Sequence, residues 1–160
     1  MPGELRIERL SEHPECLPEL KTWFEREWPE YYGAGGTGDV TADLDAYSTT
    51  EELPIGLVAL RDAALCGVAA LRAASISSRS HLGPWAGAGL VPPDLRRRGI
   101  GAMLLAALEQ LARSMRFERI YCATSTSSSL LTRSGWSFIE VIEHDGATVA
   151  IFEKVLTDAR

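Results

Sequence analysis

The amino-acid sequence predicts an α/β fold, with a mixed, mostly antiparallel twisted sheet flanked by helices. The first observation is the order of the local patterns, β-α-α-β-β-β-α-β-α-β-β, in which strand-like and helix-like segments alternate. The second is a pair of hairpin turns, at Asp62-Ala63 and Asp145-Gly146, which join neighbouring antiparallel strands. The third is length, because 160 residues without a linker-like interior stretch fit one domain, residues 1–160.

The N-terminal third is expected to contain one strand followed by two helices. Apolar side chains recur at helical spacing over Leu17–Phe24, and Ser11 is positioned to cap this first helix. Pro29 and the glycines that follow it then break the chain, and Asp39 or Thr41 can start the second helix. The expected ranges are 5–10 for the strand, 14–28 for the first helix and about 40–47 for the second.

The rest of the chain is expected to complete the sheet and to add two helices. One strand contains the small residues Ala86–Gly89, whose glycines suggest a bulge or the close approach of a ligand. A longer helix covers Ile100–Met115 with one buried apolar face, and Glu109 and Arg113 are spaced as an i,i+4 pair on it. The expected strands are 55–61, 65–71, 85–91, 120–122, 138–143 and 148–155, with a short helix at 127–134.

Composition argues against several classes of protein. The three cysteines are far apart and form no C-x-x-C motif, and the three histidines are equally scattered, so neither a disulfide framework nor a metal site is expected. A net charge of −6 makes nucleic-acid binding a poor hypothesis. No apolar run is long enough to span a membrane and the first residues show no secretory signal, so a cytoplasmic location is expected.

The charge is unevenly divided between the two parts of the chain. Residues 1–62 carry 14 acidic and 5 basic side chains, a balance of −9, whereas residues 63–160 carry 8 acidic and 11 basic side chains, a balance of +3. One interpretation is that the two halves handle ligands of opposite charge. The other is that the acidic side chains only form a solvated helix face.

The segment Val91–Gly101 has the features of an anion-binding turn. A strand ends, three arginines follow, and a helix begins at two glycines, where unpaired backbone N–H groups and the positive end of the helix dipole suit a phosphate. A P-loop would need a lysine that the sequence lacks, and a dinucleotide fingerprint would need a glycine where Leu104 stands. On these residues alone, a glycine pair used for packing beside solvent-facing arginines remains open.

The context of this turn resembles the GNAT superfamily of N-acetyltransferases. The pattern V-x-P-x-x-R-x-x-G-x-G is matched without a gap over Val91–Gly101, and a later strand and short helix end in the pair Gly135-Trp136. The resemblance implies the acyl-CoA N-acyltransferase fold. It also implies that acetyl-CoA, as co-substrate, enters where the strands at about 85–91 and 119–123 open as a V.

The resemblance assigns roles around the turn. Backbone amides there hold the CoA pyrophosphate, and the preceding strand pairs with the pantetheine arm. The N–H of Leu90 is the expected oxyanion donor, which stabilises charge that develops on the thioester oxygen. The implied cofactor-binding residues are Leu90, Val91, Arg96, Arg97, Arg98, Gly99, Ile100, Gly101, Ala102, Thr124 and Ser129.

One position departs from the pattern of the superfamily. Many members have a tyrosine four residues before the glycine-aromatic pair, where it protonates the departing thiolate, but this sequence has Leu131 there. Of the nearby hydroxyls Ser128, Ser129 and Thr132, none is an obvious replacement by spacing, and Thr132 is the candidate we carry forward. A thiolate is a good enough leaving group that the loss does not by itself abolish activity.

The acceptor site is implied to lie between the first two helices and the central strands. Glu27 is the candidate base for the incoming amine, because an alkyl ammonium must lose a proton before it attacks. Trp28, Tyr31 and Tyr32 are candidate substrate contacts, or else a satellite of the core. The acidic first 62 residues favour a cationic acceptor.

The sequence therefore predicts an acetyl-CoA-dependent N-acetyltransferase, in which a primary amine attacks directly in a ternary complex. The alternative is a non-catalytic acyl-CoA-binding or sensing module. The expected partners are a small-molecule or peptide amine, with no nucleic acid, no membrane and no metal, and the resemblance is compatible with a homodimer. The sequence names neither the acceptor, nor the replacement for the tyrosine acid, nor whether other acyl-CoAs are used.

Overall fold

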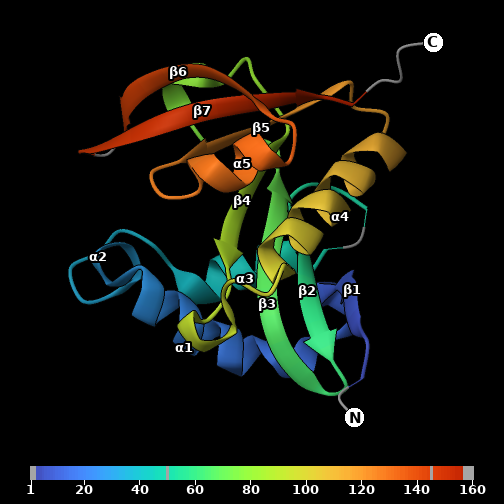
Figure 1. The fold of residues 1–160 in the computed structure, drawn as a ribbon. Helices are drawn as coiled ribbons and strands as arrows, with labels where there is room; N and C mark the ends of the chain where they lie inside the picture. Colours follow the sequence, from blue (N-terminus) through green and yellow to red (C-terminus); the bar gives the residue numbers. More distant parts are fainter. Residues whose placement is uncertain (1–2, 50, 145, 157–160) are drawn as a thin grey trace.

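The computed structural model describes residues 3–49, 51–144 and 146–156, which form a seven-stranded sheet in the order β1-β2-β3-β4-β5-β7-β6 (Figure 1). Neighbouring strands are antiparallel except for β4 and β5, which are parallel. The predicted fold class is confirmed. The strands are β1 (Leu5–Arg9), β2 (Ile55–Arg61), β3 (Ala64–Arg72), β4 (Trp85–Leu90), β5 (Arg119–Thr124), β6 (Ser137–His144) and β7 (Ala147–Val155).

The helices lie where the sequence predicts them, with one addition. A single turn, α2, begins at Pro29, where a break was expected, because proline is favoured in the first turn of a helix. The turn at Asp62 has a positive φ of 55°, as a tight hairpin requires, whereas Asp145 of the second hairpin lies outside the described residues. The helices are α1 (Leu17–Glu27), α2 (Pro29–Tyr32), α3 (Val40–Tyr47), α4 (Ile100–Ser114) and α5 (Ser128–Arg133).

The expected helix caps have different outcomes. Asp39 caps α3, with its carboxylate accepting a hydrogen bond of 3.0 Å from the amide of Ala42. Ser11 does not cap α1, because two short 3₁₀ turns intervene and α1 begins only at Leu17. The Ser11 hydroxyl is instead buried without a hydrogen-bond partner.

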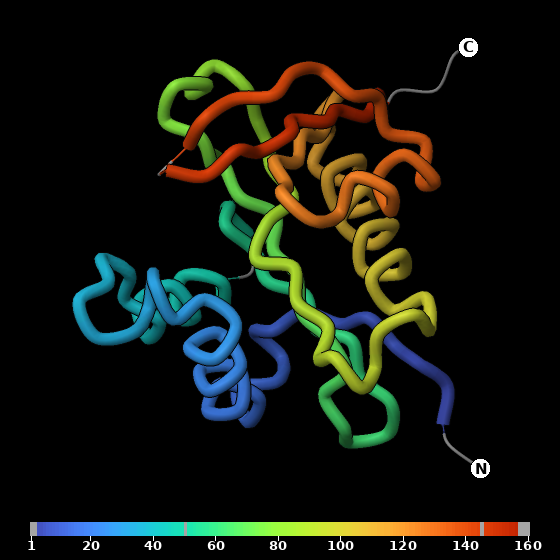
Figure 2. Tube along the Cα trace, turned by 60° about the vertical axis from the view of Figure 1, so that its left-hand side comes forward, coloured from blue at the N-terminus to red at the C-terminus, as the bar shows by residue number. Residues whose placement is uncertain are grey.

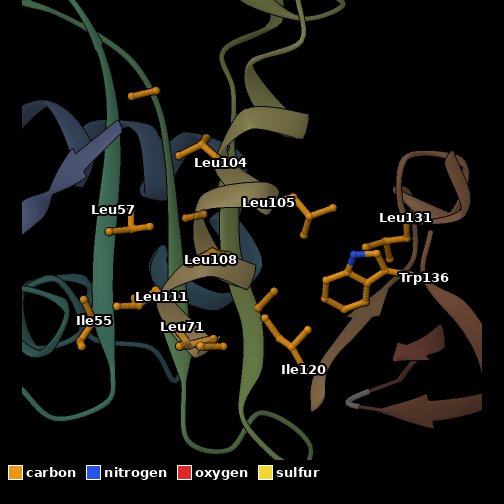
Figure 3. Packing of buried hydrophobic residues seen from close by; sticks show 14 of the residues in the cluster. Ile55, Leu57, Leu71, Leu104, Leu105, Leu108, Leu111, Ile120, Leu131 and Trp136 are labelled. Atoms are coloured by element: carbon orange, nitrogen blue, oxygen red, sulfur yellow. The ribbon is translucent and has the colours of Figure 1, made fainter. Parts of the chain in front are cut away.

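The sheet is covered on both faces. On one face, leucines of α4 pack against β2, β3 and β5, and Leu131 and Trp136 extend this core towards α5 (Figure 3). On the other face, Leu20 and Phe24 of α1 and Leu44 of α3 pack against β2 and β3. Because β2 and β3 are covered on both sides, nearly all of their residues are buried. None of the helices in the described ranges is both long and apolar enough to cross a membrane.

The predicted Glu109–Arg113 pair does not form. Glu109 is only 6% exposed, accepts a hydrogen bond of 3.0 Å from Trp136 Nε1, and lies 2.8 Å from Lys154 Nζ. Arg113 instead donates to the carbonyl oxygen of Leu156. The prediction was wrong because Glu109 faces β7 and the segment after α5, where a buried carboxylate needs its own cation.

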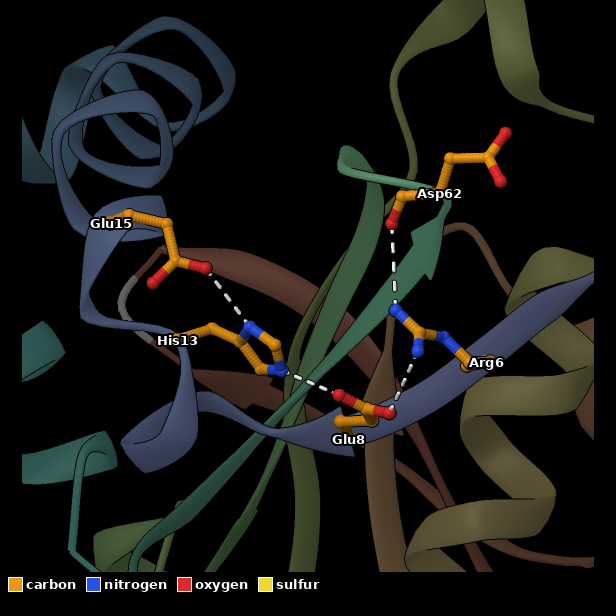
Figure 4. Close-up of polar contacts among 5 residues, drawn as sticks. All are labelled: Arg6, Glu8, His13, Glu15 and Asp62. Atoms are coloured by element: carbon orange, nitrogen blue, oxygen red, sulfur yellow. Dashed lines mark hydrogen bonds and ion pairs between the residues drawn. The ribbon is translucent and has the colours of Figure 1, made fainter. Parts of the chain in front are cut away.

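The N-terminal strand is fastened by a chain of polar contacts, which Figure 4 shows. The two ring nitrogens of His13 contact Glu8 Oε1 at 2.5 Å and Glu15 Oε2 at 3.0 Å, and Glu8 also pairs with Arg6. The hydrogen bonds to Glu15 and Glu8 raise the pKa of His13 above its ordinary value of 6.5. These contacts join β1 to the segment that leads into α1.

The sheet opens between β4 and β5. The two strands pair only at Trp85–Tyr121 and Ala86–Cys122, beyond which they separate, and Figure 2 shows β5, β6 and β7 as a group turned away from the rest. A shift in the β3–β4 register and a positive φ of 52° at Ala88 mark a bulge at the same point. The opening that the resemblance implied is confirmed, and so is the bulge, one of the two explanations of the glycines in this strand.

Candidate functional site

The start of α4 presents unpaired backbone amides to solvent. Gly99 precedes the helix with a φ of 83°, in the left-handed region that glycine adopts most easily, and no described side chain caps the helix. The first bond back to this residue comes from the amide of Met103. The amides of Ile100, Gly101 and Ala102 therefore lie in the first turn, where helix N–H groups lack intrahelical partners and attract anions.

The three arginines of the turn have distinct positions. Arg96 donates from Nε to the carbonyl oxygen of Val91 at 2.8 Å, and its guanidinium lies 3.5 Å from the Glu27 carboxylate. It thus connects the end of β4, the turn and the end of α1. Arg97 and Arg98 are exposed, and Arg97 also has a positive φ of 65°. Their charge is available to a ligand at the helix start.

The two glycines of the turn have few atoms close to them. A Cβ added at Gly99 would meet no atom within 4 Å, and one added at Gly101 would lie 3.5 Å from Leu130 Cδ2 of α5. Neither glycine is therefore required by close packing against a neighbour in the described residues. Thr124 accepts hydrogen bonds from the amides of Thr126 and Ser127, which shapes the loop between β5 and α5.

Leu131, in the position of the missing acid, belongs to the core. Its side chain is 1% exposed and lies beside Trp136 (Figure 3). Thr132 and Ser129 are exposed on α5. A leucine at position 131 is therefore explained by packing.

A cavity of about 320 Å³ lies where β4 and β5 separate. Its floor includes Ala86, Gly87 and Ala88 of β4 and Ala123 of β5, so it opens onto the gap in the strand pairing. In Figure 1, α2 lies on the same side of the molecule as the end of β6 and the start of β7. The remaining lining residues are Trp28, Tyr31, Tyr32, Tyr47, Arg72, Ser75, Ile76, His144 and Val149.

The aromatic wall of the cavity is held in place by its own contacts. Tyr31 and Tyr32 pack edge to face at 4.7 Å, and Trp28 packs edge to face on Phe24 at 5.1 Å. Tyr32 donates a hydrogen bond of 2.6 Å to Asp43, and burial together with this bond raises its pKa above the ordinary value of 10. The Tyr32 hydroxyl therefore stays protonated and bound to Asp43 at neutral pH.

The structure brings together only part of the predicted acceptor site. The candidate contacts Trp28, Tyr31 and Tyr32 all line the cavity, whereas Glu27 is exposed beside Arg96 and is not among the lining residues. Sequence reasoning missed the polar residues Arg72, Ser75 and His144 and the aromatic Tyr47.

Cys122 lies beside Ala86 at the last paired position of β4 and β5. Burial raises the pKa of its thiol to about 12, so the thiol stays protonated and is a poor nucleophile at neutral pH. In the described ranges, no three side chains of His, Cys, Asp or Glu are grouped as a metal site would require.

A family model described as the acetyltransferase (GNAT) family matches residues 17–131, which is more than half of the chain. The chain belongs to this family. As a member of the GNAT family, it is an acetyl-CoA-dependent acetyltransferase, as the turn over Val91–Gly101 predicted. No protein of curated function matches the chain by sequence.

Solved structures of GNAT proteins share this fold at low sequence identity. An aminoglycoside 6'-N-acetyltransferase complexed with coenzyme A is 15% identical, with a TM-score of 0.79 over 97% of this chain and 99% of that one. The aminoglycoside 6'-N-acetyltransferase from Enterococcus faecium is 15% identical, with a TM-score of 0.77 over the same shares. The putative acetyltransferase yncA from Salmonella typhimurium, solved with acetyl-CoA, is 13% identical, with a TM-score of 0.73 over 99% and 97%.

Proposed function

We propose that this chain transfers the acetyl group of acetyl-CoA to a primary amine, which attacks directly while both substrates are bound. The observation that supports the proposal most is that the start of α4 and the aromatic cavity lie on either side of β4, close to the place where β4 and β5 separate. The amide cradle of Gly99–Ala102 begins the helix on one face of the sheet, and the aromatic cavity lies on the other, with β4 between them. Two substrates bound in this way can meet where β4 and β5 separate.

We assign the binding of acetyl-CoA mainly to backbone groups. Acetyl-CoA supplies an acetyl group already activated as a thioester. The cradle would hold its diphosphate through the amides of Ile100, Gly101 and Ala102, with Arg97 and Arg98 adding charge. We keep Leu90 and Val91 as the backbone groups that align the pantetheine arm, and the N–H of Leu90 as the oxyanion donor.

Proton removal from the amine is proposed to occur inside the cavity. His144 lines it, and imidazole is the side chain best suited to accept a proton near neutral pH. Glu27 stays a second candidate, although its contact with Arg96 fits a bracing role better. If Glu27 braces Arg96, Glu27→Gln raises KM for acetyl-CoA and leaves the pH profile of kcat unchanged. If it is the base, the acidic limb of that profile changes. We retain Thr132 only as the weakest acid candidate, since it is exposed next to the buried Leu131.

The rival function is an acyl-CoA-binding or sensing module that catalyses no transfer. The cavity at the strand opening favours the enzyme, because a sensor of acyl-CoA alone needs no second site there. To separate the two, acetyl-CoA is incubated with a panel of primary amines, and free thiol and acetylated product are both quantified. Equal amounts of thiol and product support the enzyme. Tight binding with neither product on any amine supports the sensor.

The prediction of a cationic acceptor was based on the charge of residues 1–62 and not on a described site. The cationic acceptor expected from residues 1–62 gains no support from the cavity, because Arg72 and His144 line it and its lining in the described ranges includes no Asp or Glu. Two of the similar structures described above are aminoglycoside acetyltransferases, which keeps polycationic amines in the panel as a comparison.

A homodimer stays a prediction, which gel filtration with light scattering tests.

A further inference from the structure

Arg72 is placed to bind an anionic group inside the acceptor cavity. It is the last residue of β3, is paired with Trp85 of β4, and lines the cavity. Its side chain crosses Gly87, since Arg72 Cδ lies 2.9 Å and Nη1 3.6 Å from the position that a Cβ at Gly87 would take. Glycine at position 87 is what leaves room for this side chain.

The guanidinium of Arg72 is uncommitted within the protein. It forms no hydrogen bond or ion pair with any residue in the described ranges, in contrast to Arg79 and Arg96, which have specific partners. A partly buried guanidinium presents a planar set of donors that matches a carboxylate with two parallel hydrogen bonds. Arg72 therefore has the donors for an anion and no carboxylate of its own to occupy them.

A second polar group in the same cavity also lacks a partner. In the part of the chain that the structure describes, Ser75 Oγ and Ser11 Oγ are the buried side-chain oxygens that form no hydrogen bond. Only Ser75 lines the cavity. Buried hydroxyls are normally hydrogen-bonded, so an unpaired hydroxyl in the cavity that Arg72 also lines is explained if a bound ligand supplies its partner.

The loop that carries Ser75 is anchored from outside the cavity. Arg79 binds Glu140 of β6 through two bonds, from Nε at 3.0 Å and from Nη2 at 2.8 Å. This bidentate pair lowers the pKa of Glu140 below its ordinary value and holds the segment after β3 against β6. Ser75 and Ile76 are therefore presented to the cavity by a fixed loop rather than by a free one.

The rest of the wall indicates what accompanies the anion. Trp28, Tyr31, Tyr32 and Tyr47 supply aromatic surface, and a volume of about 320 Å³ suits a small molecule. We propose that the acceptor is an amine that carries a carboxylate close to the reacting nitrogen and an aromatic or large apolar side chain. The carboxylate binds Arg72 and Ser75. This proposal rests on the proposed N-acetyltransferase function and names its substrate class.

The reaction balances for such an acceptor. The neutral amine nitrogen forms a bond to the acetyl carbon, the carbon–sulfur bond breaks, and the sulfur leaves as the CoA thiolate. The nitrogen loses one proton to the base or to water, and the thiolate takes up one proton. No oxidant or further reactant is needed. The carboxylate is unchanged and serves only to position the amine.

Matched acceptors isolate the carboxylate. Phenylalanine and phenethylamine differ by this group alone, as do lysine and cadaverine. A third pair, β-alanine and aminoethyl phosphate, compares a carboxylate with a phosphate on a two-carbon amine. We expect kcat/KM to be at least roughly tenfold higher for phenylalanine than for phenethylamine, because phenethylamine has no carboxylate to form charge-assisted hydrogen bonds with Arg72. A preference for aminoethyl phosphate over β-alanine would identify the anion as phosphate and overturn the carboxylate assignment.

Arg72→Met should lower kcat/KM for phenylalanine at least roughly tenfold more than kcat/KM for phenethylamine, so that the preference between the two acceptors is lost. Arg72→Lys should restore only part of it, since a point charge does not reproduce the bidentate fork. Arg116→Met is the matched control, because Arg116 lies exposed beyond the far end of α4. An equal loss on both acceptors would assign Arg72 a structural role and overturn the proposal.

The two orphan serines provide an independent test. Ser75→Ala and Ser11→Ala should both leave thermal stability unchanged or raise it, because each removes a buried unsatisfied hydroxyl. Only Ser75→Ala should raise KM for phenylalanine. If both variants leave KM unchanged, Ser75 is not part of the acceptor site.

Binding of the products separates failure of this inference from failure of the proposed function. N-acetylphenylalanine and N-acetylphenethylamine are titrated calorimetrically into the full chain with CoA present, so that no turnover is required. Tighter binding of N-acetylphenylalanine that Arg72→Met removes supports the anion site even if no amine is acetylated. Equal or weaker binding overturns it, even if phenethylamine proves a good substrate.

Discussion

Replacing Gly101 by alanine should strengthen the fold and weaken acetyl-CoA binding at the same time. Gly101 lies in the first turn of α4, with a φ outside the left-handed region, and an added Cβ would meet only Leu130 Cδ2 at 3.5 Å, an ordinary van der Waals contact. Alanine is favoured over glycine in a helix by about 0.5–1 kcal/mol. For a chain of this length, we expect the Tm to rise by roughly 1–4 °C.

The effect on acetyl-CoA has the opposite sign. The methyl group would stand in front of the amides that the diphosphate approaches, and one hydrogen bond to a charged oxygen contributes about 1.5–3 kcal/mol. Loss of one such bond weakens Kd by roughly 10- to 100-fold. Differential scanning calorimetry gives the first quantity and isothermal titration of acetyl-CoA gives the second, on the same preparations.

Ala106→Gly is the matched control for the helix contribution. Ala106 is exposed on the same helix, away from its start, so glycine there should lower the Tm and leave the acetyl-CoA affinity unchanged. A Gly101→Ala variant with a raised Tm and unchanged affinity would refute the assignment of the diphosphate to this turn. A lowered Tm would instead show that the turn is packed differently.

Three further predictions concern stability. Glu109→Ala should cost about 1–3 kcal/mol in chemical denaturation, because Trp136 Nε1 loses its acceptor and Lys154 keeps only the carbonyl oxygen of Ser134; an unchanged free energy of unfolding would contradict this. His13→Gln should lower the Tm more at pH 6 than at pH 9, because a raised pKa contributes stability that is present below 6.5 and lost as the pH rises through the folded-state pKa; a Tm difference independent of pH would count against the His13 contacts. Leu131→Tyr should destabilise the protein by about 1–3 kcal/mol through overpacking beside Trp136, and a neutral effect on denaturation would mean that this helix sits more loosely than described.

Local sequence signals predicted the helices, strands and turns, whereas contacts between residues far apart in the chain could not be predicted. The hairpin at Asp62 and the cap at Asp39 depend on turn and cap chemistry, which a few adjacent residues contain. The prediction for Glu109 was wrong because its spacing of four residues from Arg113 is equally consistent with an exposed ion pair and with a position on a second buried face of the helix. Its partners, Trp136 and Lys154, are contributed by segments that only the folded chain brings near.

The candidate site divides in the same way. The cradle is one continuous segment, so its glycines and arginines could be recognised directly, whereas Arg72, Ser75 and His144 come from separate segments. The face on which Arg72 lies could not be read from the sequence, because β3 is buried on both sides and shows no alternation of polar and apolar residues. The charge of residues 1–62 was a property of the surface and not of the cavity.

The central claim is that the amine attacks acetyl-CoA directly while both are bound. Initial rates measured over a grid of acetyl-CoA and amine concentrations test it most directly, using the best acceptor from the panel. We expect double-reciprocal lines that intersect, and a rate that Cys122→Ala leaves in place because the protonated thiol takes no part. Parallel lines, which indicate an acetylated enzyme released from CoA before the amine binds, would contradict it.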